Sequence, residues 1–340
     1  MRDKPAISII IPTHNRRRLL QETVASVFAQ TFRNWELIVI DDASSDDTWE
    51  WLRGLQNAQV RIFHFEEHRE RTQARNFGLE AARGEFVLFL DDDDLLPASA
   101  LQMHWDALSQ YPETFGSVGS FIMFDENGGR QAVRYGRRRQ AHDLWPDLLF
   151  GHIPVSGQSL FRTQAMTEIN GWDTDYNICE DHVLWLKLSQ LGRIVLLPDV
   201  VLHYRLHRGQ WRPRKLWQLM TKIRKRALKK LNAAQRMQAE KILQAREHFR
   251  SGENHYARGE TVKALQAYCK TAWLLPGVLL SPVTRMMLVA PMLKCLLGGR
   301  PVIERVLGRK PLEFSRLHVA EDEGKPQEGT TSSGLIHFSS

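Results

Sequence analysis

The first half of the chain alternates short, nearly continuous apolar runs with segments whose apolar residues recur at helical spacing. The apolar runs predict strands over residues 6–12, 35–41, 60–65 and 86–90. The periodic segments predict helices over residues 18–30, 46–55 and 72–82, with Ser44 or Ser45 as the cap of the second. This alternation predicts an α/β fold in which helices cover both faces of a mostly parallel sheet.

Downstream, the same patterns predict a helix over residues 180–191 and strands over residues 115–124, 155–161, 194–197 and 200–204. From residue 215 onward, long helical periodicities replace the strands, and a polar tail follows. We therefore expect an α/β domain over residues 1–212, a helical region over 213–318 and a disordered tail over 319–340.

Composition narrows the class of protein. The chain has 340 residues, of which 43% are hydrophobic, so it can bury a full core. Its 3 cysteines lie far apart, which excludes a disulfide framework and a cysteine-based zinc site. No apolar run is long enough to span a bilayer, and the first residues do not resemble a signal peptide. These features predict a cytoplasmic protein.

Polar residues follow three of the predicted strands, over residues 13–15, 41–44 and 91–94. Ligands of parallel sheets bind beyond the carboxyl ends of the strands. Residues 91–94 are four consecutive aspartates, which repel one another unless a cation neutralises them. Mg²⁺ is commonly held by one or two carboxylates together with substrate phosphates. A solvated acidic loop is the alternative, but the preceding apolar strand and the nearby acid pair favour a metal site.

Four segments together resemble the inverting family 2 glycosyltransferases, which have the Rossmann-like GT-A fold. They are ISIIIPTHN, WELIVIDDASSDDT, ARNFGLEAARGEFVLFLDDDDLL and CEDHVLWLKL, and the resemblance covers residues 6–207. It implies transfer of a sugar from a nucleotide-sugar, expected to be a UDP-sugar, with a divalent cation, Mg²⁺ or Mn²⁺, as cofactor.

The resemblance also implies roles for residues that bind the donor. Asp42 matches the residue that hydrogen-bonds the nucleotide base, and Asp41 is its structural neighbour. The loop that lines the base corresponds to Pro12, Thr13 and His14. His14 stands where the family often has an aromatic residue, which leaves base stacking at this position open.

Two arginines and the aspartate motif complete the implied donor site. Arg75 matches the segment beside the base and ribose, and Arg71 is an alternative for the same task. In the family's DxD motif, Asp92 would approach the ribose, while Asp93, with Asp91, would ligate the metal that bridges the diphosphate. The family usually has a small residue at position 92, so the division of roles among the acids stays open.

The acid pair Glu180 and Asp181 opens a predicted helix and resembles the family's ED motif, whose Asp is the general base. A base of this kind accepts the proton of the attacking hydroxyl. The alternative is a helix N-terminus that favours acids. Arg205 and His207 resemble residues that lie over the donor diphosphate, with a structural role at a strand edge as the alternative.

The C-terminal third carries an uneven charge. Residues 200–239 contain twelve Lys and Arg residues but no Asp or Glu, although the whole chain has a net charge of only +7. Residues 215–231 predict a basic amphipathic helix, which favours either contact with an anionic membrane or packing on the first domain. Nucleic acid is not an expected partner, because no nucleic-acid-binding signature accompanies the charge.

Two further segments extend this region. Residues 247–276 resemble a single tetratricopeptide-type helical hairpin. The apolar, proline-interrupted residues 274–297 predict shallow membrane insertion or a buried helical pair. The expected function is sugar transfer to a glycan or lipid-linked acceptor at the inner membrane face. The alternative is an inactive nucleotide-sugar-binding module that acts through its helical tail, but Asp93 and Asp181 favour the enzyme.

Overall fold

The computed structural model of the protein describes residues 4–125, 129–133, 139–150, 153–206, 220, 222–223, 233–276 and 285–296. The expected domain boundary near residue 212, most of the basic helix over 215–231 and the tail over 319–340 lie outside these residues. Among the helices that are described, none is both long enough and apolar enough to cross a membrane.

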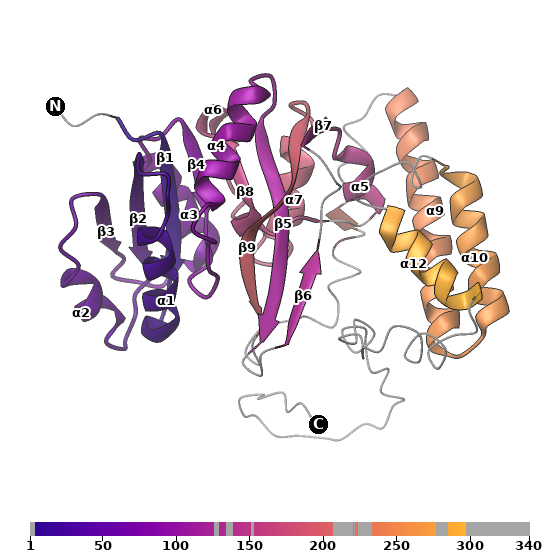
Figure 1. Ribbon diagram of the computed structural model, residues 1–340, viewed down its shortest axis with the longest axis horizontal. Helices are drawn as coiled ribbons and strands as arrows, with labels where there is room; N and C mark the ends of the chain where they lie inside the picture. The colour runs from indigo at the N-terminus through magenta and orange to yellow at the C-terminus, as the bar shows by residue number, and fades with distance from the viewer. Residues whose placement is uncertain are drawn as a thin grey trace.

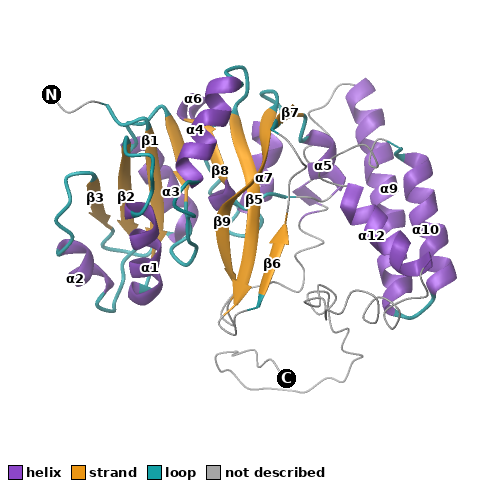
Figure 2. Ribbon diagram, in the orientation of Figure 1, coloured by secondary structure: helices purple, strands orange, loops and turns teal. Residues whose placement is uncertain are grey.

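One sheet runs through the first domain in the strand order β3-β2-β1-β4-β8-β5-β9-β7, with β6 paired to β5 (Figures 1 and 2). Its first four strands are all parallel, as expected: β1 (Ile7–Thr13), β2 (Trp35–Asp41), β3 (Val60–His64) and β4 (Phe86–Phe89). Each begins and ends within a residue of its predicted range. Apolar runs predict such strands well because the side chains are buried on both faces.

Helices cover both faces of this parallel part, which confirms the expected α/β architecture. They are α1 (Arg17–Phe28), α2 (Thr48–Arg53) and α3 (Glu70–Ala81). Alternate residues of one strand enter different cores: Ile9 packs in a cluster with Leu20 of α1, and Ile10 packs in another with Ala74 of α3. This division follows from the two-residue period of a strand.

The second half of the sheet is mixed, which the apolar pattern did not reveal. β8 (Ser159–Arg162) pairs antiparallel with β4 and with β5 (Gly116–Asp125), whereas β9 (Ile194–Leu206) is parallel to β5. β6 (Arg130–Val133) and β7 (Gln140–His142) add antiparallel pairs. Strand direction depends on partners that are distant in sequence, so local periodicity cannot predict it.

The separate strands expected over residues 194–197 and 200–204 are one strand, β9. Its pairing with β5 continues across an irregularity at Pro198 and Asp199. Ser120 stabilises this bulge, since its hydroxyl donates to Pro198 O at 3.0 Å. A proline cannot donate to a sheet ladder, and a bulge is one place where a strand tolerates it.

Other local predictions also need correction. The strand expected over residues 155–161 begins only at Ser159, after the 3₁₀ helix η1 (Ser156–Gln158). The N-cap position of α2 is Asp47, whose side chain makes no capping hydrogen bond, rather than Ser44 or Ser45, which instead bond to Asn15. The remaining helices of this domain are α4 (Ala100–Gln110), α5 (Trp145–Phe150), α6 (Thr163–Glu168) and α7 (Glu180–Leu188), of which only the last was predicted.

Among the described residues after β9, a helical region lies beside β7 and α5, at the right of Figure 1, and includes α9 (Ala233–Ala257), α10 (Thr261–Leu274) and α12 (Arg285–Leu296). α9 and α10 form a hairpin that begins earlier than the predicted residue 247. A Cβ atom on Gly252 would lie 2.5 Å from the Tyr268 ring, so the glycine permits the close approach of the two helices. This region joins the sheet domain through α5 and α9, where the rings of Phe150 and Phe249 are 5.4 Å apart.

Replacement of Gly78 by alanine should destabilise the protein, because α3 lies directly on the sheet at this residue. A Cβ atom there would overlap Ile10 and lie 2.9 Å from Ile40 Cδ1. Overpacking of a core typically costs about 1–3 kcal/mol, which outweighs the helix propensity of alanine, worth up to about 1 kcal/mol. Urea unfolding of Gly78→Ala measures this. The exposed Gln73→Ala on the same helix is the control, and equal stability of both variants would contradict the prediction.

Candidate functional site

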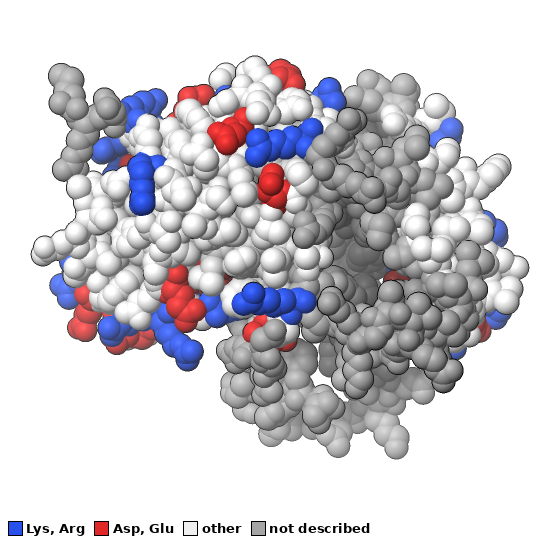
Figure 3. All heavy atoms as spheres, viewed as in Figure 1, with Lys and Arg blue, Asp and Glu red and all other residues white. Residues whose placement is uncertain are grey.

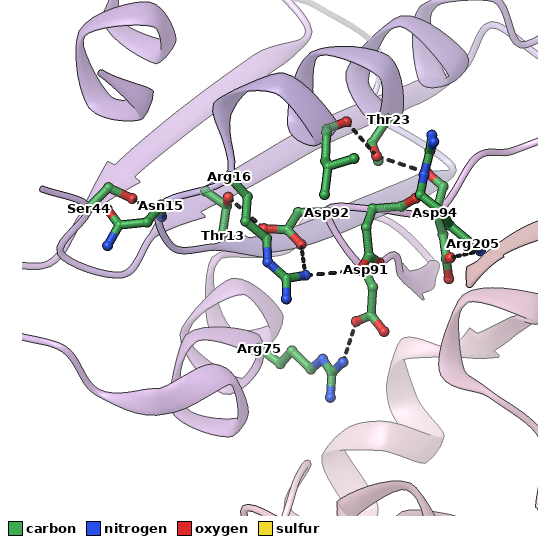
Figure 4. A network of polar contacts seen from close by, with 12 residues as sticks. Thr13, Asn15, Arg16, Thr23, Ser44, Arg75, Asp91, Asp92, Asp94 and Arg205 are labelled. Carbon is green, nitrogen blue, oxygen red and sulfur yellow. Dashed lines mark hydrogen bonds and ion pairs between the residues drawn. The ribbon is translucent and has the colours of Figure 1, made fainter. Parts of the chain in front are cut away.

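The carboxyl ends of β1, β2 and β4 meet at one edge of the sheet. Asp42 N donates to Thr13 O at 2.8 Å, and Leu90 N donates to Ile10 O at 3.0 Å. Residues 91–94 therefore leave the sheet beside the end of β1 (Figure 4). A row of acidic and basic side chains lies along the lower edge of the molecule in Figure 3, the edge toward which β5 points in Figure 1.

The four consecutive aspartates form a compact acidic cluster. One carboxylate oxygen from each of Asp91, Asp93 and Asp94 lies within 4.8 Å of the others. Burial, and then the charges of Asp93 and Asp91, hold the pKa of Asp94 well above its usual range. Burial likewise raises the pKa of Asp92 to about 6. Crowded carboxylate oxygens are the ligands that Mg²⁺ and Mn²⁺ prefer, so this donor set fits a divalent cation. Asp94 is a further candidate ligand beside the predicted Asp91 and Asp93.

Arg16 supplies a positive charge to the cluster. Its Nη1 atom lies 3.1 Å from Asp92 Oδ1 and 2.9 Å from Asp93 Oδ2. Thr13 donates to the other oxygen of Asp92 at 2.8 Å, so both oxygens of this carboxylate are engaged (Figure 4). Sequence reasoning missed Arg16, although a cation just after the first strand end, opposite an acidic segment, was a usable signal.

Arg205 connects the end of β9 to the same cluster. Its backbone N–H donates to Asp94 Oδ1 at 2.9 Å, and its Nε donates to Asp93 O at 2.8 Å. Its Nη2 lies 2.6 Å from Glu22 Oε2 on α1. The predicted Arg205 therefore lies at the acidic cluster, whereas the predicted His207 lies outside the described residues.

The residues expected around the base lie at the adjacent ends of β1 and β2. Asp42 accepts from Arg69 N at 2.7 Å and pairs with His68 Nδ1 at 2.9 Å. The His14 ring contacts Asp42 O through Nδ1 at 2.6 Å, and its centroid is 4.5 Å from that of His68. Two imidazoles therefore line this side of the site. The sequence analysis missed His68, which lies in a loop without a recognised motif.

Asp41 and Pro12 are buried behind this surface, at the ends of β2 and β1. Asp41 Oδ2 lies 2.7 Å from His64 Nδ1, and the His64 ring stacks on Trp49 with centroids 4.5 Å apart. Asp41 thus contacts neighbouring strands, in keeping with its expected position beside Asp42.

Arg75 lies between the acidic cluster and the first turn of α7. Its side chain is 1% exposed, with Nη2 at 2.5 Å from Asp91 Oδ1 and Nη1 at 3.5 Å from Glu180 Oε1. The guanidinium also lies 4.4 Å from the centre of the Trp172 ring. Burial opposes its charge, but the surrounding carboxylates raise the pKa of Arg75 nonetheless. Arg71 Nε contacts the same oxygen of Glu180 at 2.8 Å.

Asp181 is partly buried beside Glu180, and its Oδ1 atom has no hydrogen-bond partner among the described residues. Burial, and then the charge of Glu180, raise the pKa of Asp181 to about 7. A carboxylate with an unengaged oxygen and a near-neutral pKa can accept a proton from a substrate. The site thus combines a cluster suited to a cation with a carboxylate suited to act as a base.

The family model "Glycosyl transferase family 2" matches residues 8–167. Over 188 residues the chain is 40% identical to GalNAc(5)-diNAcBac-PP-undecaprenol beta-1,3-glucosyltransferase of Campylobacter jejuni, covering 54% of this chain and 60% of that protein. Over 198 residues it is 37% identical to UDP-Glc:alpha-D-GlcNAc-diphosphoundecaprenol beta-1,3-glucosyltransferase WfgD of Escherichia coli, covering 56% and 73%. The chain covers less than two thirds of the Campylobacter jejuni protein, and it covers only 20% of an uncharacterised Sinorhizobium fredii protein, to which it is 31% identical over 194 residues.

Solved structures resemble the whole fold. The crystal structure of S. aureus TarS 1-349 in complex with UDP-GlcNAc has a TM-score of 0.57 and 18% sequence identity, and the match covers 90% of this chain and 93% of that chain. A longer TarS structure has the same TM-score, with 20% identity and coverage of 85% and 54%. The sheet topology, the family model and the E. coli relative all indicate the same family. The chain therefore belongs to glycosyl transferase family 2 and has the GT-A fold.

Proposed function

We propose that the protein is a metal-dependent, inverting glycosyltransferase that transfers a sugar from a UDP-sugar to a lipid-linked acceptor in cell-surface polysaccharide synthesis. The observation that carries this proposal is the unengaged oxygen of Asp181, whose pKa is raised to about 7. Its neighbour Glu180 is linked to the acidic cluster through Arg75, which also contacts Asp91. An inactive nucleotide-sugar-binding module would not need such a carboxylate.

The donor proposal uses the edge formed by β1, β2 and β4. Asp91, Asp93 and Asp94 would hold the divalent cation, which when bound supplies positive charge to the donor diphosphate. Asp42, with His14 and the loop before α3, would contact the base. The UDP-GlcNAc bound by TarS and the UDP-Glc in the name of the E. coli relative support a UDP-sugar as the donor.

In the proposed reaction, the acceptor hydroxyl attacks the anomeric carbon from the side opposite the diphosphate. Asp181 accepts the hydroxyl proton as the new carbon–oxygen bond forms. The bond from the anomeric carbon to the diphosphate oxygen breaks, UDP leaves with that electron pair, and the configuration inverts. Arg205 and Arg16 lie at the acidic cluster and place positive charge on the side where negative charge develops.

The acceptor proposal rests on the two relatives whose names specify lipid-diphosphate acceptors. We propose the same acceptor class here, with the enzyme in peripheral contact with the inner face of an anionic membrane. On α10, Trp273 is 82% exposed, and the exposed Lys263 and Lys270 lie on the same helix. Indole rings and lysines are typical of surfaces that contact lipid headgroups.

Binding of UDP should require a divalent cation held through Asp93. Calorimetric titration with Mn²⁺ should give clear binding, and EDTA should abolish it. Asp93→Asn should weaken binding, because one ligand loses its negative charge, whereas the exposed Glu113→Gln should behave as wild type. Equal UDP affinity with and without EDTA would contradict metal dependence.

Asp181→Asn should lower turnover by roughly 10²–10⁴-fold, since the amide keeps the shape but cannot accept a proton. UDP binding should be unchanged, because the base serves the acceptor. In the wild type, burial and Glu180 raise the pKa of Asp181 to about 7, and the deprotonated form is the active one, so the rate should rise with pH through neutrality. Asp181→Asn should lose that dependence. Normal turnover of this variant would contradict the proposed function.

Liposome flotation tests the membrane contact. Full-length protein should float with anionic vesicles and less so at high salt, because each lysine near the surface contributes about 1 kcal/mol of attraction. Trp273→Ala should reduce flotation, while the exposed Gln266→Ala on the same helix should not. Protein that stays in the soluble fraction with anionic vesicles at low salt would contradict peripheral binding.

A further inference from the structure

Helix α3 contacts the start of α7 through polar side chains on one face. Arg71 Nε lies 2.8 Å from Glu180 Oε1, and Arg71 Nη2 donates to Asn177 O at 3.2 Å. Thr72 donates to Asn177 Oδ1 at 3.3 Å. One turn further along, Arg75 Nη1 lies 3.5 Å from the same Glu180 oxygen. We call Arg71, Arg75 and Glu180 the arginine clamp.

The other end of Arg75 is fixed at the acidic cluster. Its Nη2 contacts Asp91, and its guanidinium packs on the Trp172 ring (Figure 4 shows the contact with Asp91). The Trp172 backbone is itself held by Asn76, which accepts from Trp172 N at 2.8 Å and donates to Trp172 O at 2.9 Å. Because the Arg75 side chain is buried, turning it toward a ligand would cost Asp91 its contact with the guanidinium, while Glu180 would keep its contact with Arg71.

The residue just before α7 has an unusual backbone conformation that neighbouring contacts must hold in place. Cys179 has a φ of 61°, a backbone conformation that residues with a side chain rarely adopt. A strained residue of this kind persists only where the surrounding structure holds it. The two arginines contact Glu180, which directly follows Cys179. By fixing Glu180, they restrict the position of the following residue, Asp181.

We propose that Arg71 and Arg75 are positioning residues that hold Asp181 at a set place relative to the acidic cluster. This inference rests on the proposed role of Asp181 as the base. It gives the two arginines a role on the acceptor side of the reaction, through the residue that accepts the proton of the acceptor hydroxyl. A displacement of a reacting group by about 1 Å can cost about 10²-fold in rate, so the clamp should influence turnover directly.

The test is a double-mutant cycle on Arg71 and Glu180, measured as kcat, donor KM and UDP affinity. Arg71→Gln and Glu180→Gln should each lower kcat by up to about 10²-fold, with UDP affinity unchanged. The double variant should be no slower than the slower single variant, because both changes break the same contact. Arg83→Gln, which alters an exposed arginine just after α3, is the matched control and should keep wild-type kcat.

Two conservative variants sharpen the test. Arg71→Lys keeps a charge that can reach Glu180 and should restore part of kcat. Arg75→Lys should not restore kcat, because a single ammonium group cannot bridge Asp91 and Glu180 as a guanidinium does. Thermal melting shows whether Arg75→Lys is folded. If it is not, the Arg71 series alone decides the outcome, since the Arg71 side chain is 49% exposed.

Loss of UDP affinity in Arg71→Gln as large as the loss of kcat would show that the arginine contacts the donor, and would overturn the inference. Additive losses in the double variant would overturn it as well. If Arg71→Gln has normal turnover while Asp181→Asn is inactive, only the positioning role of the arginines is contradicted. Normal turnover of Asp181→Asn contradicts the proposed function instead, so the two failures are distinguishable.

Discussion

The repulsion among four consecutive carboxylates is the constraint on which the rest of the site depends. Residues 91–94 bring these charges to one strand end, largely out of contact with water. Buried like charges are costly unless cations balance them. Three arginines from separate elements do so: Arg16 before α1, Arg75 on α3 and Arg205 on β9. The acidic cluster therefore organises the elements around it as well as offering ligands to a metal.

Arg205 and Arg75 also contact residues outside the cluster. Arg205 extends to Glu22 of α1, which ties the last strand of the sheet to the first helix. Arg75 extends to Glu180, which ties the donor half of the domain to the helix that carries Asp181. The proposed two-substrate reaction would need such links, because the two halves of the site come from different parts of the chain and must meet with a defined geometry.

The predictable parts of the protein are those specified by local sequence. Strands β1 to β4 follow from apolar runs buried on both faces, and the parallel arrangement brings Thr13, Asp42 and Asp91 to one edge. The second half was less predictable, because β5, β8 and β9 pair in mixed directions across long sequence separations. The bulge at Pro198 shows the same limit, since a break in the apolar pattern did not break the strand.

By itself, the sequence determined the family, the α/β architecture and the identity of the acidic residues, because these depend on residue type and on spacing along the chain. Only the tertiary structure decided which basic side chain pairs with which acidic side chain. It places Arg16 and Arg205 on the acidic cluster, turns Arg71 and Arg75 toward Glu180, and brings His68 against Asp42. The physical reason is that an ion pair forms wherever folding brings opposite charges together, and no local pattern records that distance.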